Sequence, residues 1–249
     1  MDRQERSRLA HAHHPVTAPL ADDTVAALLR HAVRRGDERV LQLGCGSGAW
    51  LLRALAAHPE LTADGVDPDP AALTDARVAA EQLGLARRLG LHHRAPADFT
   101  AARPYDLLLC VGATPALGGL LPALAAAERQ LAPGGTLLLG QGYWQRPPEQ
   151  AARDALGPLA DDLRDLPALT DLLTTAGWLP VHGHTSTRAE LDDYEWSWTG
   201  SLTAWALDHP EHPAAAQAAS TATDHRTAWL HGYREAFGFV TLLLRRRAG

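Results

Sequence analysis

Three glycines and an aspartate have the types and spacing expected of a nucleotide-binding loop. Gly44, Gly46 and Gly48 stand directly after a short apolar run, and Asp67 ends the next expected strand. Glycines let the chain turn sharply and let a ligand approach the backbone closely, and the start of a following helix presents free amides. An acid after the second strand can accept hydrogen bonds from ribose hydroxyls. This order predicts a site for a cofactor that contains adenosine.

A second set of residues could move a proton. His11, His13 and His14 lie near the N-terminus, and Tyr194 and Glu195 are adjacent much later in the chain. Histidine titrates near neutrality and can take a proton from a phenol or an amine. We therefore predict these histidines and Glu195 as candidate bases, with Tyr194 as an orienting hydroxyl. The alternative is that these histidines are ordinary surface residues, as most of the 13 histidines of the chain must be.

Aromatic side chains gather in two places. Tyr143 and Trp144 directly follow a buried strand, and Trp196 and Trp198 lie in a segment that is unusually rich in Trp and Tyr for a chain with 6% aromatic residues. Such rings can stack on a flat acceptor or surround a cationic amine. We predict that these four residues bind substrate. The alternatives are that they pack a helical insert onto the sheet or form a dimer interface.

Composition excludes several classes of protein. The 249 residues are 46% hydrophobic and 21% charged, which is typical of a globular protein large enough for a full core. All 23 basic residues are Arg, and the absence of Lys excludes a Schiff-base lysine and a Walker-type phosphate loop. Two cysteines are too few for a disulfide framework, a Cys-based zinc site or an iron–sulfur cluster. We expect no metal site, no membrane helix and no signal peptide, and a cytoplasmic location. The net charge of -6 does not favour nucleic acid as a partner.

Short apolar runs alternate with helical patterns along most of the chain. This alternation predicts a doubly covered, mostly parallel sheet of seven strands, with a helical insert before the last strand. We expect strands over residues 39–43, 62–67, 88–93, 106–111, 136–140, 179–184 and 238–245. We expect helices over residues 24–35, 50–57, 70–83, 120–131 and 166–176, and two helical pieces in 187–232 separated at 209–213. Asp22 or Asp23 is the expected cap of the first helix.

The glycine loop, Asp67 and the later stretch from Leu131 to Leu139, which contains Pro133-Gly134-Gly135, resemble the class I S-adenosylmethionine-dependent methyltransferases. The apolar strand expected over residues 238–245 adds to this resemblance, because the last strand in that family is antiparallel to its neighbour. Further segments, among them residues 11–15 and 110–114 and the stretch Asp193-Tyr194-Glu195, look like a group of poorly characterised bacterial small-molecule methyltransferases. That resemblance implies a Rossmann-like fold with S-adenosylmethionine as cofactor and S-adenosylhomocysteine as product.

The resemblance also assigns roles to individual residues. It implies that the glycine loop faces the methionine part and the ribose, and that Asp67 binds the ribose hydroxyls. The sequence departs from the family at two positions: Ala95 replaces an acid that often holds the adenine, and Gln42 replaces an acid frequent in the first strand. Asp98 or the backbone near Ala97 is the expected substitute at the adenine. The implied cofactor-binding residues are Gly44, Cys45, Gly46, Gly48, Asp67, Pro68, Ala97, Asp98, Cys110 and Gly112.

The sequence therefore predicts methyl transfer to nitrogen or oxygen of a small aromatic or heterocyclic molecule. It predicts one domain over residues 1–249, divided into a lead-in (1–36), a cofactor-binding core (37–187), an aromatic-rich insert (188–234) and a last strand (235–249), in a monomer or homodimer. Two alternatives stay open. The loop also satisfies the dinucleotide pattern G-x-G-x-x-A, so an NAD-dependent oxidoreductase is one. A non-catalytic protein that keeps the cofactor fold as a binding or scaffold module is the other.

Overall fold

The computed structural model describes residues 1–247, and the chain forms two compact units. The sheet unit comprises Ala21–Gln141, Pro167–Thr185 and the described part of the stretch that begins at Val240. The helical unit comprises Met1–Leu20, Gly142–Leu166 and Ser186–Phe239.

The sheet unit is built on seven strands in the order β3-β2-β1-β4-β5-β7-β6. The strands are β1 (Arg39–Leu43), β2 (Thr62–Asp67), β3 (Leu89–His93), β4 (Tyr105–Val111), β5 (Leu131–Trp144), β6 (Trp178–Thr185) and β7 (Phe237–Arg246). The pairs β3–β2, β2–β1, β1–β4 and β4–β5 are parallel, whereas β7 and β6 are antiparallel. The predicted fold is confirmed, including the reversed strand at the C-terminus.

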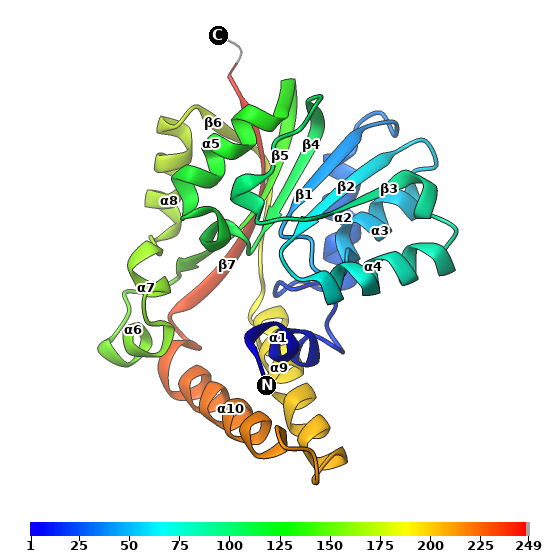
Figure 1. Ribbon diagram of the computed structural model, residues 1–249. Helices are drawn as coiled ribbons and strands as arrows, with labels where there is room; N and C mark the ends of the chain where they lie inside the picture. Colours follow the sequence, from blue (N-terminus) through cyan, green and yellow to red (C-terminus); the bar gives the residue numbers. More distant parts are fainter. Residues whose placement is uncertain (248–249) are drawn as a thin grey trace. The chain divides into compact units, whose positions relative to one another are not determined.

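Helices connect and cover these strands. They are α2 (Asp22–Ala32), α3 (Ala49–Ala57), α4 (Pro70–Gln82), α5 (Leu120–Gln130) and α8 (Leu166–Thr175), with short turns η1 (Ala86–Arg88), η2 (Pro96–Asp98) and η3 (Thr114–Leu117). Within this unit α3 packs beside β2, α4 beside β3 and α5 beside β4 (Figure 1). Because helices cover the strands, the central strands are apolar without alternation, and Leu107, Leu108 and Leu109 are all fully buried.

The helical unit contains α1 (Arg3–Ala10), α6 (Gln150–Leu156), α7 (Leu159–Asp162), α9 (Arg188–Asp208), α10 (Ala215–Ala228) and the π-helical turn η4 (Trp229–Tyr233). A capping box begins α9: the Thr187 side chain accepts from the Glu190 amide, and the Glu190 carboxylate accepts from the Thr187 amide. The two helices of the insert are separated where the sequence predicts. Trp144, Trp229 and Tyr233 share one hydrophobic cluster of this unit, and Leu202 and Ala218 join α9 to α10 in another.

The structure differs from the sequence analysis in three places. The sequence does not predict α1, because its residues are mostly polar and show no apolar periodicity; Asp2 caps it by accepting from the Glu5 amide. Neither Asp22 nor Asp23 caps α2: Ala21 is its N-cap, and the Asp22 carboxylate instead pairs with Arg53 at 2.6 Å. Strand β5 extends beyond the predicted 136–140 at both ends, with a register shift where Pro133-Gly134-Gly135 interrupts its pairing with β4.

Candidate functional site

The glycine loop joins β1 to α3 and is tied to the end of β2. The amides of Gly44 and Cys45 both donate to the Val66 carbonyl, at 2.9 and 3.1 Å. Gly44 has φ 74°, and a Cβ there would lie 2.6 Å from the Ala113 Cβ. Glycine is therefore required at this position by its backbone conformation and by the close approach of the β4–η3 loop.

Asp67 also holds the glycine loop. Its Oδ2 accepts from the Gly46 amide at 2.8 Å, and its Oδ1 accepts from the Asp69 amide at 2.9 Å. A carboxylate oxygen has two lone pairs, so each oxygen can still accept from a hydroxyl. The carboxylate thus holds the loop and keeps acceptor capacity for a diol.

The first turns of α3 and α4 differ in whether a side chain caps their amides. Gly48 is the N-cap of α3 and has no side chain to accept from the first-turn amides, so these amides are available to an oxygen-rich ligand. Asp69 caps α4 by accepting from the amides of Ala71 and Ala72. The neighbouring Pro68 is exposed, and its carbonyl lies 3.1 Å from His93 Nε2.

The remaining predicted cofactor residues follow β3 and β4. Ala97 and Asp98 are exposed in η2, and Gly112 donates its amide to the Gly140 carbonyl at 3.0 Å. Cys110 is buried, and burial raises the pKa of its thiol to about 12. Burial, together with the Asp67 charge, also raises the pKa of the Cys45 thiol. Both cysteines are therefore neutral thiols at pH 7 and not nucleophiles.

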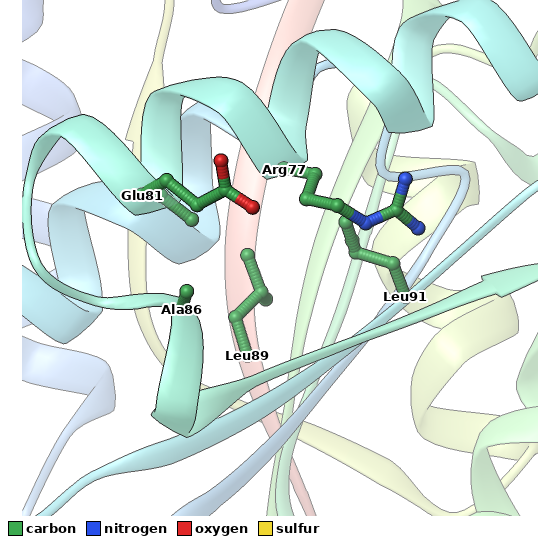
Figure 2. Close-up of a pocket in the computed structure, with 6 residues that line it drawn as sticks. Arg77, Glu81, Ala86, Leu89 and Leu91 are labelled. Carbon is green, nitrogen blue, oxygen red and sulfur yellow. The ribbon is translucent and has the colours of Figure 1, made fainter.

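Parallel strands β1 to β4 end at one edge of the sheet, and this places the predicted cofactor residues in loops at that edge. A shallow cleft in the same unit lies elsewhere, between α4 and β3 (Figure 2). Its wall includes Leu89, the first residue of β3, and Ala86 just before it. It therefore lies near the amino end of β3, and no predicted site residue lines it.

The helical unit brings three predicted catalytic residues together. His11 Nδ1 lies 2.7 Å from the Ser7 carbonyl, which can only accept, so Nδ1 carries the proton. His11 Nε2 lies 2.9 Å from the Tyr194 hydroxyl and accepts from it when the imidazole is neutral. The His14 ring meets the Tyr194 ring edge-on at 5.3 Å, and His14 Nδ1 donates to the Val16 carbonyl at 2.6 Å.

Burial keeps this pair neutral. It lowers the pKa of His11, and the hydrogen bond to Ser7 acts in the opposite direction. Burial, with the nearby Glu195 charge, raises the pKa of the Tyr194 phenol. The Tyr194 phenol thus donates to the His11 imidazole. His13, the third predicted histidine, has its Nδ1 3.0 Å from the Ser201 hydroxyl.

Glu195 points to two residues that the sequence analysis missed. Its Oε2 lies 2.7 Å from His225 Nε2, and its Oε1 accepts from the Tyr233 hydroxyl at 2.8 Å. The Trp198 ring stacks on the His225 ring with centroids 4.0 Å apart. No local spacing signals these partners, because they follow Glu195 by 30 and 38 positions.

The predicted substrate-binding aromatics have different surroundings within the helical unit. Tyr143 and Trp144 are buried, and Tyr143 covers Gly238, where a Cβ would lie 2.5 Å from the Tyr143 Cζ. Trp196 is 52% exposed and meets Trp229 edge-on at 5.0 Å. Trp196 therefore has free surface for a ligand, whereas the structure gives Trp144 a packing role.

Among residues 1–247 the structure contains no cluster of three or more His, Cys, Asp or Glu side chains arranged to hold a metal ion. In the same part of the chain, no helix is both long and apolar enough to span a membrane.

Comparison with known proteins agrees with this geometry. A family model described as a methyltransferase domain matches residues 41–137. The uncharacterized protein YjhP of Escherichia coli is 27% identical over 98% of this chain and 99% of its own length, and its crystal structure superposes with a TM-score of 0.89.

Two further crystal structures are equally similar. A S-adenosylmethionine-dependent methyltransferase from Geobacter sulfurreducens, in complex with S-adenosylhomocysteine, has a TM-score of 0.90 and 25% identity, covering 98% of both chains. A methyltransferase from Thiobacillus denitrificans, in complex with the same molecule, shares the fold with a TM-score of 0.90 at 24% identity, covering 99% of this chain and 100% of its own. The chain thus carries a methyltransferase domain in residues 41–137, in a fold that it shares with S-adenosylmethionine-dependent methyltransferases that bind S-adenosylhomocysteine.

Proposed function

We propose that the protein transfers the methyl group of S-adenosylmethionine to a nitrogen or oxygen atom of a small aromatic or heterocyclic molecule. The cofactor binds to the glycine loop, with Asp67 on the ribose hydroxyls, Pro68, Ala97 and Asp98 at the adenine, and Cys110 to Gly112 near the sulfonium. The tether between Asp67 and the Gly46 amide supports this assignment, because it keeps loop and carboxylate in one fixed arrangement.

Methyl transfer from a sulfonium is an in-line displacement in which a neutral thioether leaves. The leaving group needs no acid, so the protein contributes by holding the nucleophile about 3 Å from the methyl carbon and by removing the acceptor's proton. We propose His11, His14, Tyr194 and Glu195 as the candidate groups for this second task.

The observation that carries the choice of acceptor is the composition of the helical unit. The His225 imidazole stacks on the Trp198 ring, and the exposed Trp196 ring meets Trp229 edge-on. Such rings suit a flat molecule with a polar edge. A net charge of -6 and the absence of Lys do not favour a polyanionic acceptor.

Calorimetric titration with S-adenosylhomocysteine, with NAD as the paired control, tests the cofactor. Micromolar binding of the former alone is the expected result, and binding of NAD alone would revive the oxidoreductase alternative. Radiolabelled S-adenosylmethionine is then offered with phenols, catechols and heterocyclic amines, and in separate arms with tRNA and a protein mixture. Label transfer only to tRNA or protein would refute the small-molecule acceptor, and binding without any transfer would favour the non-catalytic alternative.

A further inference from the structure

A buried glutamine of the sheet unit holds the chain directly after the predicted adenine-binding turn η2. Gln130 is the last residue of α5 and is 4% exposed. Its Nε2 donates to the Phe99 carbonyl at 2.7 Å, and its Oε1 accepts from the Ala101 amide at 3.0 Å. Phe99 directly follows Asp98, the last residue of η2. A side chain from a separate helix therefore fixes the backbone next to Asp98.

The two bonds match the chemistry of an amide side chain. A backbone carbonyl only accepts and a backbone N–H only donates, so the partner must offer one donor and one acceptor. An ionised glutamate accepts but cannot donate. Removing the buried Gln130 amide would leave the Phe99 carbonyl and the Ala101 N–H without this partner, which is costly for buried groups. The pair of bonds therefore favours one arrangement of this backbone.

The Phe99 ring is held as well. It lies against the His92 ring of β3, with the ring centroids 5.0 Å apart. His92 is itself fixed, because its Nε2 lies 2.8 Å from the Asp64 Oδ1. A Cβ at Gly90 would overlap the same oxygen, so glycine leaves the room that this carboxylate occupies. Phe99 is thus held at its carbonyl from α5 and at its ring from β3.

The turn η2 is tied to the strand that carries the predicted ribose carboxylate. The Arg94 amide, directly after β3, donates to the Asp67 carbonyl at 3.2 Å. Two residues later η2 begins at Pro96, which is buried. The Asp98 amide donates to the Ala95 carbonyl at 3.0 Å and closes the turn. The turn that ends at Asp98 is therefore fixed to Asp67 at one side and to Gln130 at the other, all within the sheet unit.

The Asp98 carboxylate has unused capacity to accept hydrogen bonds. Asp98 is exposed, and among residues 1–247 no hydrogen bond or ion pair engages its side-chain oxygens. An ionised carboxylate only accepts, so it suits the amino group at C6 of adenine and opposes a carbonyl oxygen at the same position. The carboxylate can thus distinguish two purine bases that differ in this group.

We propose that Gln130 is a positioning residue for cofactor recognition, which fixes the turn so that Asp98 accepts from the adenine amino group. Through Asp98 it sets the preference for adenine over a 6-oxopurine. This inference rests on the proposed binding of S-adenosylmethionine at this edge of the sheet. It also decides between Asp98 and the backbone near Ala97 as the group that recognises the base.

The first experiment measures base preference by calorimetry. The ligands are S-adenosylhomocysteine and S-inosylhomocysteine, whose base carries an oxygen in place of the amino group. We expect the wild type to prefer the former by roughly 10-fold and Gln130→Met by about 2-fold or less, since a hydrogen bond to a charged group is lost. Gln82→Met is the matched control, because Gln82 is also the last residue of its helix and is exposed. An unchanged preference in Gln130→Met would overturn the inference.

The ratio of the two affinities separates positioning from general damage. Asp67→Ala should weaken both ligands and keep the preference, because the predicted ribose contacts are common to both. Asp98→Asn lies on the surface and tests the inference even where Gln130→Met does not fold. Its amide can donate to the 6-oxo group, so the preference for adenine should disappear or invert. Adding Gln130→Met to Asp98→Asn should change the preference no further.

Two outcomes in the other variants and the wild type contradict different claims. An Asp98→Asn protein with the wild-type preference would overturn the inference, as would a wild-type protein that binds both ligands equally; the proposed methyl transfer would stand in either case. A wild-type protein that binds neither ligand would overturn the proposed function itself.

Discussion

Replacing Asp67 by Ala tests the cofactor site most directly. The change removes two oxygens that accept from the Gly46 and Asp69 amides, at 2.8 and 2.9 Å, and the predicted contacts to two ribose hydroxyls. A hydrogen bond to a charged group contributes about 1.5–3 kcal/mol, and a loosened loop must be reordered when the ligand binds. We expect binding of S-adenosylhomocysteine to weaken by about 1–3 kcal/mol, a factor of roughly 5 to 150.

Calorimetry measures this affinity, and two further variants help to interpret it. Asp67→Asn keeps one carbonyl oxygen, so its loss should be intermediate. Asp75→Ala removes an exposed acid of α4 in the same unit and should bind as the wild type does. A folded Asp67→Ala protein with unchanged affinity would refute the placement of the ribose at this carboxylate.

Three other predictions concern the loop, the buried histidine and the exposed tryptophan. Gly44→Ala should lower the free energy of unfolding in urea more than Gly84→Ala does. Both glycines have positive φ, which costs an alanine about 1–2 kcal/mol, but only at Gly44 would the new Cβ collide with Ala113. Gly44→Ala should also lose binding of S-adenosylhomocysteine. Because its folded-state pKa is lowered, His11 binds protons more readily in the unfolded chain; stability should fall as pH drops below about 6.5, and thermal melts of His11→Gln should show a shallower loss. Trp196 is exposed, so Trp196→Ala should barely change the melting temperature yet raise KM for the acceptor. Trp178 is buried in the core of the sheet unit, so Trp178→Ala should lower the free energy of unfolding by about 3–5 kcal/mol. An unchanged KM in Trp196→Ala would show that Trp196 does not contact the acceptor.

The sequence by itself predicts most of the sheet unit. Strands such as Tyr105–Val111 are short apolar runs bounded by proline and glycine, and burial on both faces makes those runs nearly continuous and easy to recognise. The same holds for the glycine loop, since positive φ restricts the residue type within a few positions. The insert is also predictable, because the stretch at 209–213 contains two prolines that separate α9 from α10.

Local pattern fails where the outcome depends on a distant partner. Asp22 precedes a helix and has the type of a cap, yet its carboxylate pairs with Arg53 on another helix. Helix α1 has no apolar periodicity, and its contacts with α9 hold it in place.

The helical unit shows the same division most clearly. The sequence alone singles out Tyr194 and Glu195 but cannot say which partner each one has. Tertiary structure decides that Tyr194 donates to His11 and that Glu195 holds His225 and Tyr233. The physical reason is that periodicity and turn chemistry act over a few residues, whereas a buried carboxylate must find its donors wherever packing brings them.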